Sequence, residues 1–181
     1  MCGIVAVTGY KKALPLLMNG LEKLEYRGYD SAGIAVINSE TNSITCNKAE
    51  GKLKNLKNNL NHENIPGTVG IGHTRWATHG KPEVKNAHPH IDSSGNIAVV
   101  QNGIIENFQD LKNKLEKDGV TFNSDTDTEV IPHLIQRELN TLSKLNLENN
   151  GSTLLVAVRN VLSDLEGSYA CLLYTSDAAD E

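Results

Sequence analysis

The stretch MCGIVAV at residues 1–7 decides the fold of this chain. Residues 4–8 form a short, β-branched apolar run that Gly9 ends. Such a run predicts a buried strand. Cys2 stands directly before this strand, and Gly3 has no Cβ, so the backbone there can pass close to a bound substrate. Any chemistry of Cys2 is therefore expected at the end of a core strand.

Outward from this strand, the hydrophobic spacing predicts a layered domain. Apolar residues three or four apart predict helices at 14–24, 106–117, 129–139 and 153–165, with a short polar helix at 52–60. Strands are expected at 32–37, 44–48, 69–73 and 97–101, followed by an apolar segment at 169–174. Residues 25–31 and 140–150 are expected to be loops. Strands come first and helices cluster later, which indicates mixed layers rather than a regular βαβ series.

The composition narrows the class of protein. The chain has 181 residues, 39% of them hydrophobic, and a formal net charge of -5, which suits one globular domain. An acidic chain without a polybasic stretch offers no surface for nucleic acid or an anionic membrane. Three cysteines do not form a disulfide framework. We expect a cytoplasmic domain whose partners are small molecules or another protein.

Cys2 is the most informative single residue. A thiol needs a base to become a strong nucleophile. If Met1 is removed, Cys2 carries a free α-amine with a pKa of about 7.7–8.0, and this amine can accept the thiol proton and later return it. From its position alone, the alternative is a buried structural cysteine that happens to stand second.

Six motifs occur in one order along the chain. They are MCGIVAV at 1–7, EYRGYDSAG at 25–33, HTRWATHGKP at 73–82, NAHPH at 86–90, QNGIIEN at 101–107 and SDTDTE at 124–129. Together they resemble the glutaminase domain of the glucosamine-6-phosphate synthase family, over about residues 2–170. The opening motif alone marks only the wider class II glutamine amidotransferases.

The resemblance implies an α+β fold of the N-terminal-nucleophile hydrolase type, a four-layer αββα sandwich of two stacked antiparallel sheets. It implies that Cys2 forms a γ-glutamyl thioester with L-glutamine, releasing ammonia and then glutamate, without a metal or cofactor. In the full-length enzyme, a sugar-phosphate isomerase domain uses the ammonia to convert fructose 6-phosphate to glucosamine 6-phosphate. Nothing in this chain resembles that second domain. The alternatives are the glutaminase domain of another class II amidotransferase, or a non-catalytic glutamine-binding module.

Asn102 and Gly103 are expected at the end of a strand. The attack on an amide carbonyl requires donors for the developing negative charge, and the Asn102 side chain and Gly103 N–H can supply two. The resemblance gives them this oxyanion role. From the dipeptide alone, the alternative is an ordinary Asn-Gly hairpin turn.

Glutamine also presents a carboxylate and an ammonium group. Arg75 offers a bidentate guanidinium for the former, and Asp127 can pair with the latter; both match the glutamine-binding positions of the family. The alternatives are solvated surface charges, or, for Asp127, a helix cap. Asp125 is the better candidate for that cap or for a turn.

The loop after Arg75 contains Trp76, Thr78 and His79, which the resemblance assigns to a lid that folds over glutamine and excludes water. The alternative is that Trp76, the only tryptophan in the chain, is a core residue. Arg27 and Asp30, in the EYRGYDSAG motif, are expected to be scaffolding near the nucleophile, held by charge pairing.

Four histidines could suggest a zinc site: His73, His79, His88 and His90. Their spacing, and that of the cysteines, matches no set of metal ligands. We expect these histidines to hydrogen-bond loops together instead, and we assign no metal.

Residues 171–181 depart from the family pattern. After Ala170 the family continues with an apolar strand, whereas residues 175–181 here are polar and acidic. We therefore expect a domain over residues 2–170 and an atypical, foreign tail, whose deletion from residue 175 should leave the melting temperature unchanged.

Overall fold

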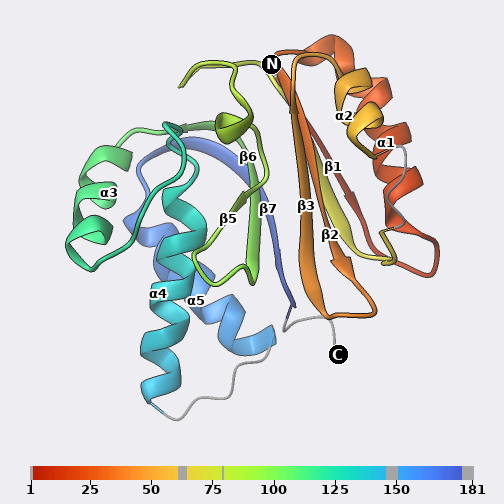
Figure 1. The fold of residues 1–181 in the computed structure, drawn as a ribbon. Coiled ribbons are helices and arrows are strands. Elements are labelled where there is room, and N and C mark those ends of the chain that lie inside the picture. Colours follow the sequence, from red (N-terminus) through yellow and green to blue (C-terminus); the bar gives the residue numbers. More distant parts are fainter. Residues whose placement is uncertain (1, 61–64, 79, 146–150, 177–181) are drawn as a thin grey trace.

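A computed structural model describes residues 2–60, 65–78, 80–145 and 151–176 of the chain. Two antiparallel sheets lie face to face (Figure 1). In the first, the strand order is β1 (Gly3–Val7), β4 (Gly70–Arg75), β2 (Ser31–Asn38) and β3 (Ser43–Glu50). The second has the order β5 (His90–Ile91), β6 (Ile97–Ile105) and β7 (Gly167–Thr175).

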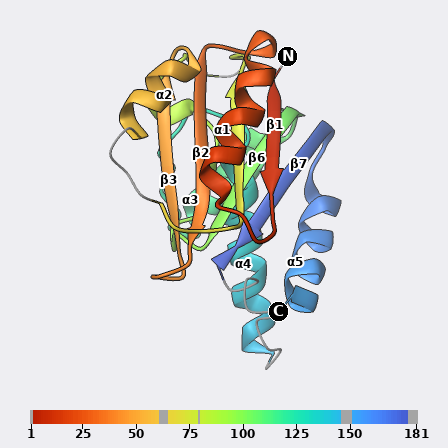
Figure 2. The ribbon, with the colours of Figure 1, turned by 90° about the vertical axis from the view of Figure 1, so that its right-hand side faces the viewer.

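Helices cover the outer face of each sheet. Helices α1 (Ala13–Leu24) and α2 (Leu53–Leu60) lie across the four-stranded sheet, as Figure 2 shows. On the outer side of the three-stranded sheet lie α3 (Phe108–Lys117), α4 (Val130–Lys144) and α5 (Gly151–Asp164). The predicted four-layer αββα sandwich is thus confirmed. In the described part of the chain, no helix is both long and apolar enough to span a membrane.

Three apolar clusters fill the spaces between the four layers. Leu17 and Leu21 of α1 are fully buried against Ile34 and Val36 of β2. A larger cluster joins α3, α4 and α5 to β6. The cluster between the sheets combines small side chains, such as Ala35 and Ala98, with larger ones, such as Ile71. Close packing of this kind lets the two sheets approach each other.

Several elements are longer than the sequence predicts, and one strand is additional. The strand expected at 97–101 continues to residue 105, because β7 pairs with β6 along its whole length. The helix expected at 129–139 continues through Lys144, because Leu142 packs into the core. No strand is predicted at residues 90–91, yet His90 and Ile91 pair with Val99 and Ala98.

The last described residues belong to the second sheet. Thr175 pairs with Ile97, and the backbone N–H of Ser176 donates to Asn96 O at 3.1 Å. Both residues are buried. These contacts argue against an unchanged melting temperature after deletion from residue 175, which stays a prediction; residues 177–181 lie outside the described part. The foreign origin of residues 171–181 stays a prediction.

The two sheets come closest where β2 meets the segment before β5. A Cβ built on Gly33 would lie 2.2 Å from the carbonyl oxygen of His88 and 3.0 Å from that of Asn47. Backbone atoms cannot move aside as a flexible side chain can. Gly33 is thus the residue that allows His88 to lie beside the first sheet.

Gly33→Ala is expected to lower the free energy of unfolding by about 1–3 kcal/mol, because the added methyl group must push two backbone segments apart. Urea denaturation measures this change. The control is Gly95→Asn, at a turn with φ +78° and open space around the Cβ position. Asparagine tolerates that backbone conformation, so the control should change stability by less than about 0.5 kcal/mol. Equal losses in both variants would contradict the role given to Gly33.

A buried carboxylate organises the segment before α4. Glu129 Oε1 accepts from the backbone N–H of Asn123 at 2.8 Å, and Oε2 accepts from the backbone N–H and hydroxyl of Ser124 at 2.7 and 2.5 Å. His133 Nε2 lies 3.8 Å from Oε1. Burial alone would raise the pKa of Glu129, but His133 and these donors outweigh it and lower the pKa to about 2.

The lowered pKa of Glu129 predicts that the free energy of unfolding depends on pH in the acid range. An unfolded glutamate has a pKa of about 4.3, so ionised Glu129 stabilises the fold above that pH, and the contribution is lost as the pH falls toward 2. Glu129→Gln should lower the free energy of unfolding at pH 7 by about 1–3 kcal/mol and should weaken its fall between pH 4.5 and 2. Glu116→Gln, at an exposed position of α3, is the control. A wild-type pH profile in the variant would refute the assignment.

Candidate functional site

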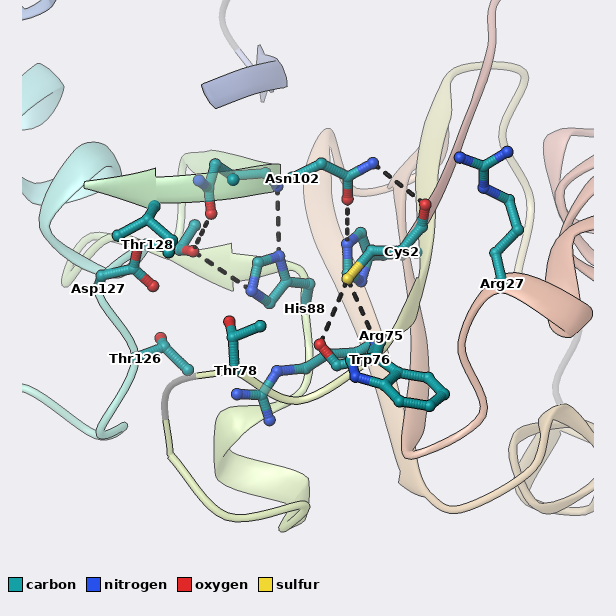
Figure 3. Close-up of a pocket in the computed structure, with 14 residues that line it drawn as sticks. Cys2, Arg27, Arg75, Trp76, Thr78, His88, Asn102, Thr126, Asp127 and Thr128 are labelled. Atoms are coloured by element: carbon teal, nitrogen blue, oxygen red, sulfur yellow. Dashed lines mark hydrogen bonds between the residues drawn. The ribbon is translucent and has the colours of Figure 1, made fainter. Parts of the chain in front are cut away.

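The thiol of Cys2 lies at the junction of β1 and β4. Gly3 pairs with Thr74, so Cys2 stands beside Arg75 and Trp76 at the end of β4. The backbone N–H of Trp76 lies 3.2 Å from Cys2 Sγ, and Sγ lies 3.5 Å from Trp76 O (Figure 3). The backbone of Trp76 thus contacts the sulfur with both its N–H donor and its carbonyl acceptor.

Gly3 has a packing role that the sequence did not indicate. A Cβ at Gly3 would lie 2.7 Å from Leu24 Cβ and 2.8 Å from Thr74 Oγ1. The missing side chain therefore lets β1 pack closely against α1 and β4. The expected close approach to a bound substrate stays a prediction.

Asn102 and Gly103 lie inside β6, not at its end. The hairpin-turn alternative is therefore wrong, because both residues pair with β7, opposite Ala170 and Tyr169. Gly103 has φ +124°, and a Cβ there would lie 2.1 Å from Ser168 O. Only glycine suits this left-handed conformation and close contact. The Asn102 Nδ2 group donates to Cys2 O at 3.3 Å, which links the two sheets beside the thiol.

A cavity of about 580 Å³ opens at this junction. Its lining includes the predicted site residues Cys2, Arg75, Trp76, Thr78, Asn102, Gly103 and Asp127 (Figure 3). Segments as far apart as residues 2 and 127 thus meet around one space, of a size typical for a small-molecule site. His79 lies outside the described residues.

Arg75 and Asp127 are both buried in the cavity wall, so the solvated-charge alternative is wrong for them. The Arg75 guanidinium donates to the carbonyl oxygens of Gly80 and Lys81, each at 3.3 Å. It therefore holds the far end of the loop that begins at Trp76. Asp127 Oδ2 accepts from the backbone N–H of Ile105 at 2.8 Å. This bond anchors Asp127 to β6, so the carboxylate faces the cavity from a fixed position.

Asp125 behaves differently from Asp127. Its carboxylate is exposed and lies 2.8 Å from Lys85 Nζ. The backbone N–H of Asp125 donates to Asn86 Oδ1 at 2.8 Å. Helix α4 begins with Glu129 as its N-cap residue, without a side-chain cap bond. The cap predicted for Asp125 is therefore wrong, and this residue instead ties its loop to residues 85–86.

Trp76 is 46% exposed, so the core alternative for this side chain is wrong. Its ring packs edge-on against Tyr29, with ring centroids 5.7 Å apart and an interplanar angle of 77°. Asp30 supports the same loop, since its Oδ2 accepts from the backbone N–H of Ala77 at 2.8 Å. Asp30 is scaffolding, as expected, but this contact is a hydrogen bond to the backbone rather than a charge pair. Arg27 lines the cavity near Cys2.

Histidines form part of the cavity wall and were not predicted to do so. His73 and His88 are stacked with ring centroids 4.3 Å apart, and His88 meets His90 edge-on at 4.7 Å. Burial lowers the pKa of all three, for His73 to about 4, so they are neutral at physiological pH. Among the described residues, no group of His, Cys, Asp and Glu has the arrangement of a metal site.

Other polar side chains complete the wall: Gln101, Thr126 and Thr128. None of these three residues was predicted from the sequence to be part of the site. The available signal was a polar residue inside an otherwise apolar strand, as at Gln101 in β6. Thr128 Oγ1 donates to Gln101 Oε1 at 2.7 Å, whereas Gln101 Nε2 is buried without a hydrogen-bond partner among the described residues.

The chain is similar in sequence to longer proteins of known name. The chain is 51% identical over its whole length to a glutamine–fructose-6-phosphate aminotransferase (isomerizing) from Gloeobacter violaceus. It is 53% identical over 94% of its length to the Synechocystis protein of the same name. It spans only 28% and 26% of the length of these two relatives.

The chain is also similar in fold to parts of solved structures. The glutamine phosphoribosylpyrophosphate amidotransferase of B. subtilis superposes on 97% of this chain with a TM-score of 0.75 and 30% identity, over 35% of its own length. A structure described as the allosteric regulatory enzyme of purine biosynthesis gives a TM-score of 0.77 at 30% identity, with 97% and 36% coverage. The fold is therefore that of the N-terminal-nucleophile amidotransferases.

A protein-family model described as a glutamine amidotransferase domain matches residues 35–146, which is more than half of the chain. The matched region includes β3, β4, β6 and α4, and thus Arg75, Asn102, Gly103 and Asp127 of the cavity. The chain belongs to the glutamine amidotransferase domain family.

Proposed function

We propose that this domain hydrolyses L-glutamine with Cys2 as nucleophile, and that in a longer protein the ammonia converts fructose 6-phosphate to glucosamine 6-phosphate. One observation carries the first part: the Cys2 thiol, the Asn102 amide and the buried charges of Arg75 and Asp127 line one cavity. The names of relatives that are 51–53% identical support the second part.

The cycle begins once Met1 has been removed. The Cys2 thiol gives its proton to its own α-amine, and Sγ forms a bond to the side-chain amide carbon of glutamine. The Asn102 side chain and the Gly103 N–H receive the negative charge that develops on the carbonyl oxygen. The carbon–nitrogen bond then breaks, and the α-amine returns its proton to the departing ammonia. Water hydrolyses the thioester, which releases glutamate and restores the thiol.

The two buried charges would orient the other end of glutamine. Arg75 offers a planar pair of N–H groups to the α-carboxylate. Asp127 keeps one carboxylate oxygen bonded to Ile105 N–H, and its second oxygen can pair with the α-ammonium group. Trp76 and Thr78 would belong to the covering loop, together with His79. The contacts of this loop with Arg75 and Asp30 favour a hinge at residues 75–77.

Ammonia transfer requires a second domain, since the two relatives are more than three times as long as this chain. We infer that this domain is the sugar-phosphate isomerase of the same enzyme. The alternative, an amidotransferase of purine biosynthesis, has weaker support at 30% identity. We also infer a cytoplasmic setting, because Cys2, Cys46 and Cys171 are all free thiols.

Cys2→Ala and Cys2→Ser are each expected to lower glutaminase kcat by about 10⁴-fold or more, because the nucleophile is lost. An assay of glutamate release measures this. Residues added before Cys2 should have the same effect, because the α-amine then becomes an amide. Cys46→Ala, in β3, is the control and should remain active. An electrophilic glutamine analogue should add once, at Cys2, by mass spectrometry, and addition at Cys46 instead would refute the assignment. Unaltered activity without Cys2 would refute Cys2 as the nucleophile, and glutamine binding without any glutamate release would favour a binding module.

Asp127→Asn is expected to raise KM for glutamine about 10- to 100-fold, because a charge-assisted contact to the ammonium group contributes about 1.5–3 kcal/mol. The substituted amide oxygen can still accept from Ile105 N–H, so the fold should persist. Asp125→Asn, two residues away and exposed, is the matched control and should change KM less than about threefold. If both variants raise KM equally, Asp127 does not contact the ammonium group.

A further inference from the structure

The side chain of Asn102 is held from two sides. Its Nδ2 group lies 3.3 Å from Cys2 O. A backbone carbonyl can only accept a hydrogen bond, so the NH₂ group must face Cys2. The Oδ1 atom therefore faces His73 Nε2, which lies 2.9 Å away. The orientation of the amide thus follows from the chemistry of its neighbours.

This orientation determines the proton position on His73. Asn102 Oδ1 can only accept, so the neutral ring must carry its proton on Nε2. The opposite nitrogen, Nδ1, is buried and has no hydrogen-bond partner among the described residues. A buried donor without a partner is costly, which also favours the proton on Nε2. Burial lowers the His73 pKa to about 4, against the effects of Asn102 and the Gln101 backbone, and keeps the ring neutral.

The His73 ring itself is held in place. His73 pairs with Ile4 on one side of β4 and with Gly33 on the other. Its ring stacks on His88 with an interplanar angle of 20°. His88 Nδ1 accepts from the backbone N–H of Gln101 at 3.2 Å, which leaves the His88 proton on Nε2, facing Thr128 Oγ1 at 3.3 Å. The histidine pair is thus bonded to β6 directly before Asn102.

We propose that His73 is a positioning residue, whose Nε2–H holds Asn102 Oδ1 so that Nδ2 points to the site of oxyanion formation. This inference rests on the proposed function. The Nδ2 group has two hydrogens; Cys2 O takes one and leaves the other for the oxyanion. Without His73, only the 3.3 Å hydrogen bond to Cys2 O holds the orientation of the Asn102 amide, so a rotation by half a turn costs less. Its oxygen would then face the oxyanion and repel it instead of donating to it.

The test compares two replacements of similar length. His73→Gln keeps an N–H donor close to the position of Nε2, whereas His73→Met removes it. Removal of one oxyanion donor lowers kcat by about 10²- to 10³-fold, so loss of its orientation in His73→Met should lower kcat about 10- to 100-fold. KM should stay within about threefold of the wild-type value, and His73→Gln should recover most of kcat.

A double-mutant cycle separates positioning from a general loss of packing. In the Asn102→Ala background, His73→Met should cause little further loss of kcat, because its effect acts through Asn102. Equal losses in both backgrounds, or equal defects in the Gln and Met variants, would overturn the proposal. Wild-type activity is measured first, since its absence is a failure of the proposed function and not of this inference.

A readout independent of activity is the tautomer of His73. Nitrogen-15 NMR at pH 7 should show His73, assigned by its absence from His73→Gln, as the neutral form protonated on Nε2. The side-chain NH₂ signals of Asn102 should shift in His73→Met and return toward their wild-type positions in His73→Gln. A ring protonated on Nδ1 would refute the proposal whether or not the sample hydrolyses glutamine.

Discussion

Backbone pairing between β1 and β4 is the constraint on which the site depends. With Gly3 opposite Thr74, the residue before β1 lies beside the residues that end β4, so Cys2 meets Arg75 and Trp76. A slip of one residue would turn every side chain of β1 to the other face of the sheet. Asn102 reaches the same point from the second sheet and bonds to Cys2 O. The cavity therefore forms only when both sheets are stacked in this register.

Many polar side chains around the cavity are held by hydrogen bonds to one another and to the backbone. Glu129 is ionised among donors, whereas the stacked histidines are neutral because burial disfavours their charge. Hydrogen bonds with the backbone fix the positions of Asp127 and Arg75 in the wall. Rigid groups of this kind need little rearrangement when a reaction develops charge, which is the general advantage of a preorganised site.

The sequence predicted the layers and most of the site, but not the details set by long-range pairing. Helix periodicity identified α1 and α3, because an amphipathic face is a local property. The motif match placed Arg75 and Asp127 in one cavity, as the structure does. Asn102-Gly103 has the local chemistry of a turn, and only the pairing with β7 keeps it within a strand. The role of His73 could not be predicted either, since its partner lies 29 residues away.

The contact between Cys2 Sγ and the Trp76 backbone joins the proposed nucleophile to the loop that is proposed to cover glutamine. A thiol or thiolate sulfur accepts a hydrogen bond better than the sulfur of a thioester, whose lone pairs are drawn toward the carbonyl. Acylation would therefore loosen the tether at residue 76, and deacylation would restore it. The hydrogen bond from the Trp76 N–H would then link the bonding state of the sulfur to the mobility of the loop.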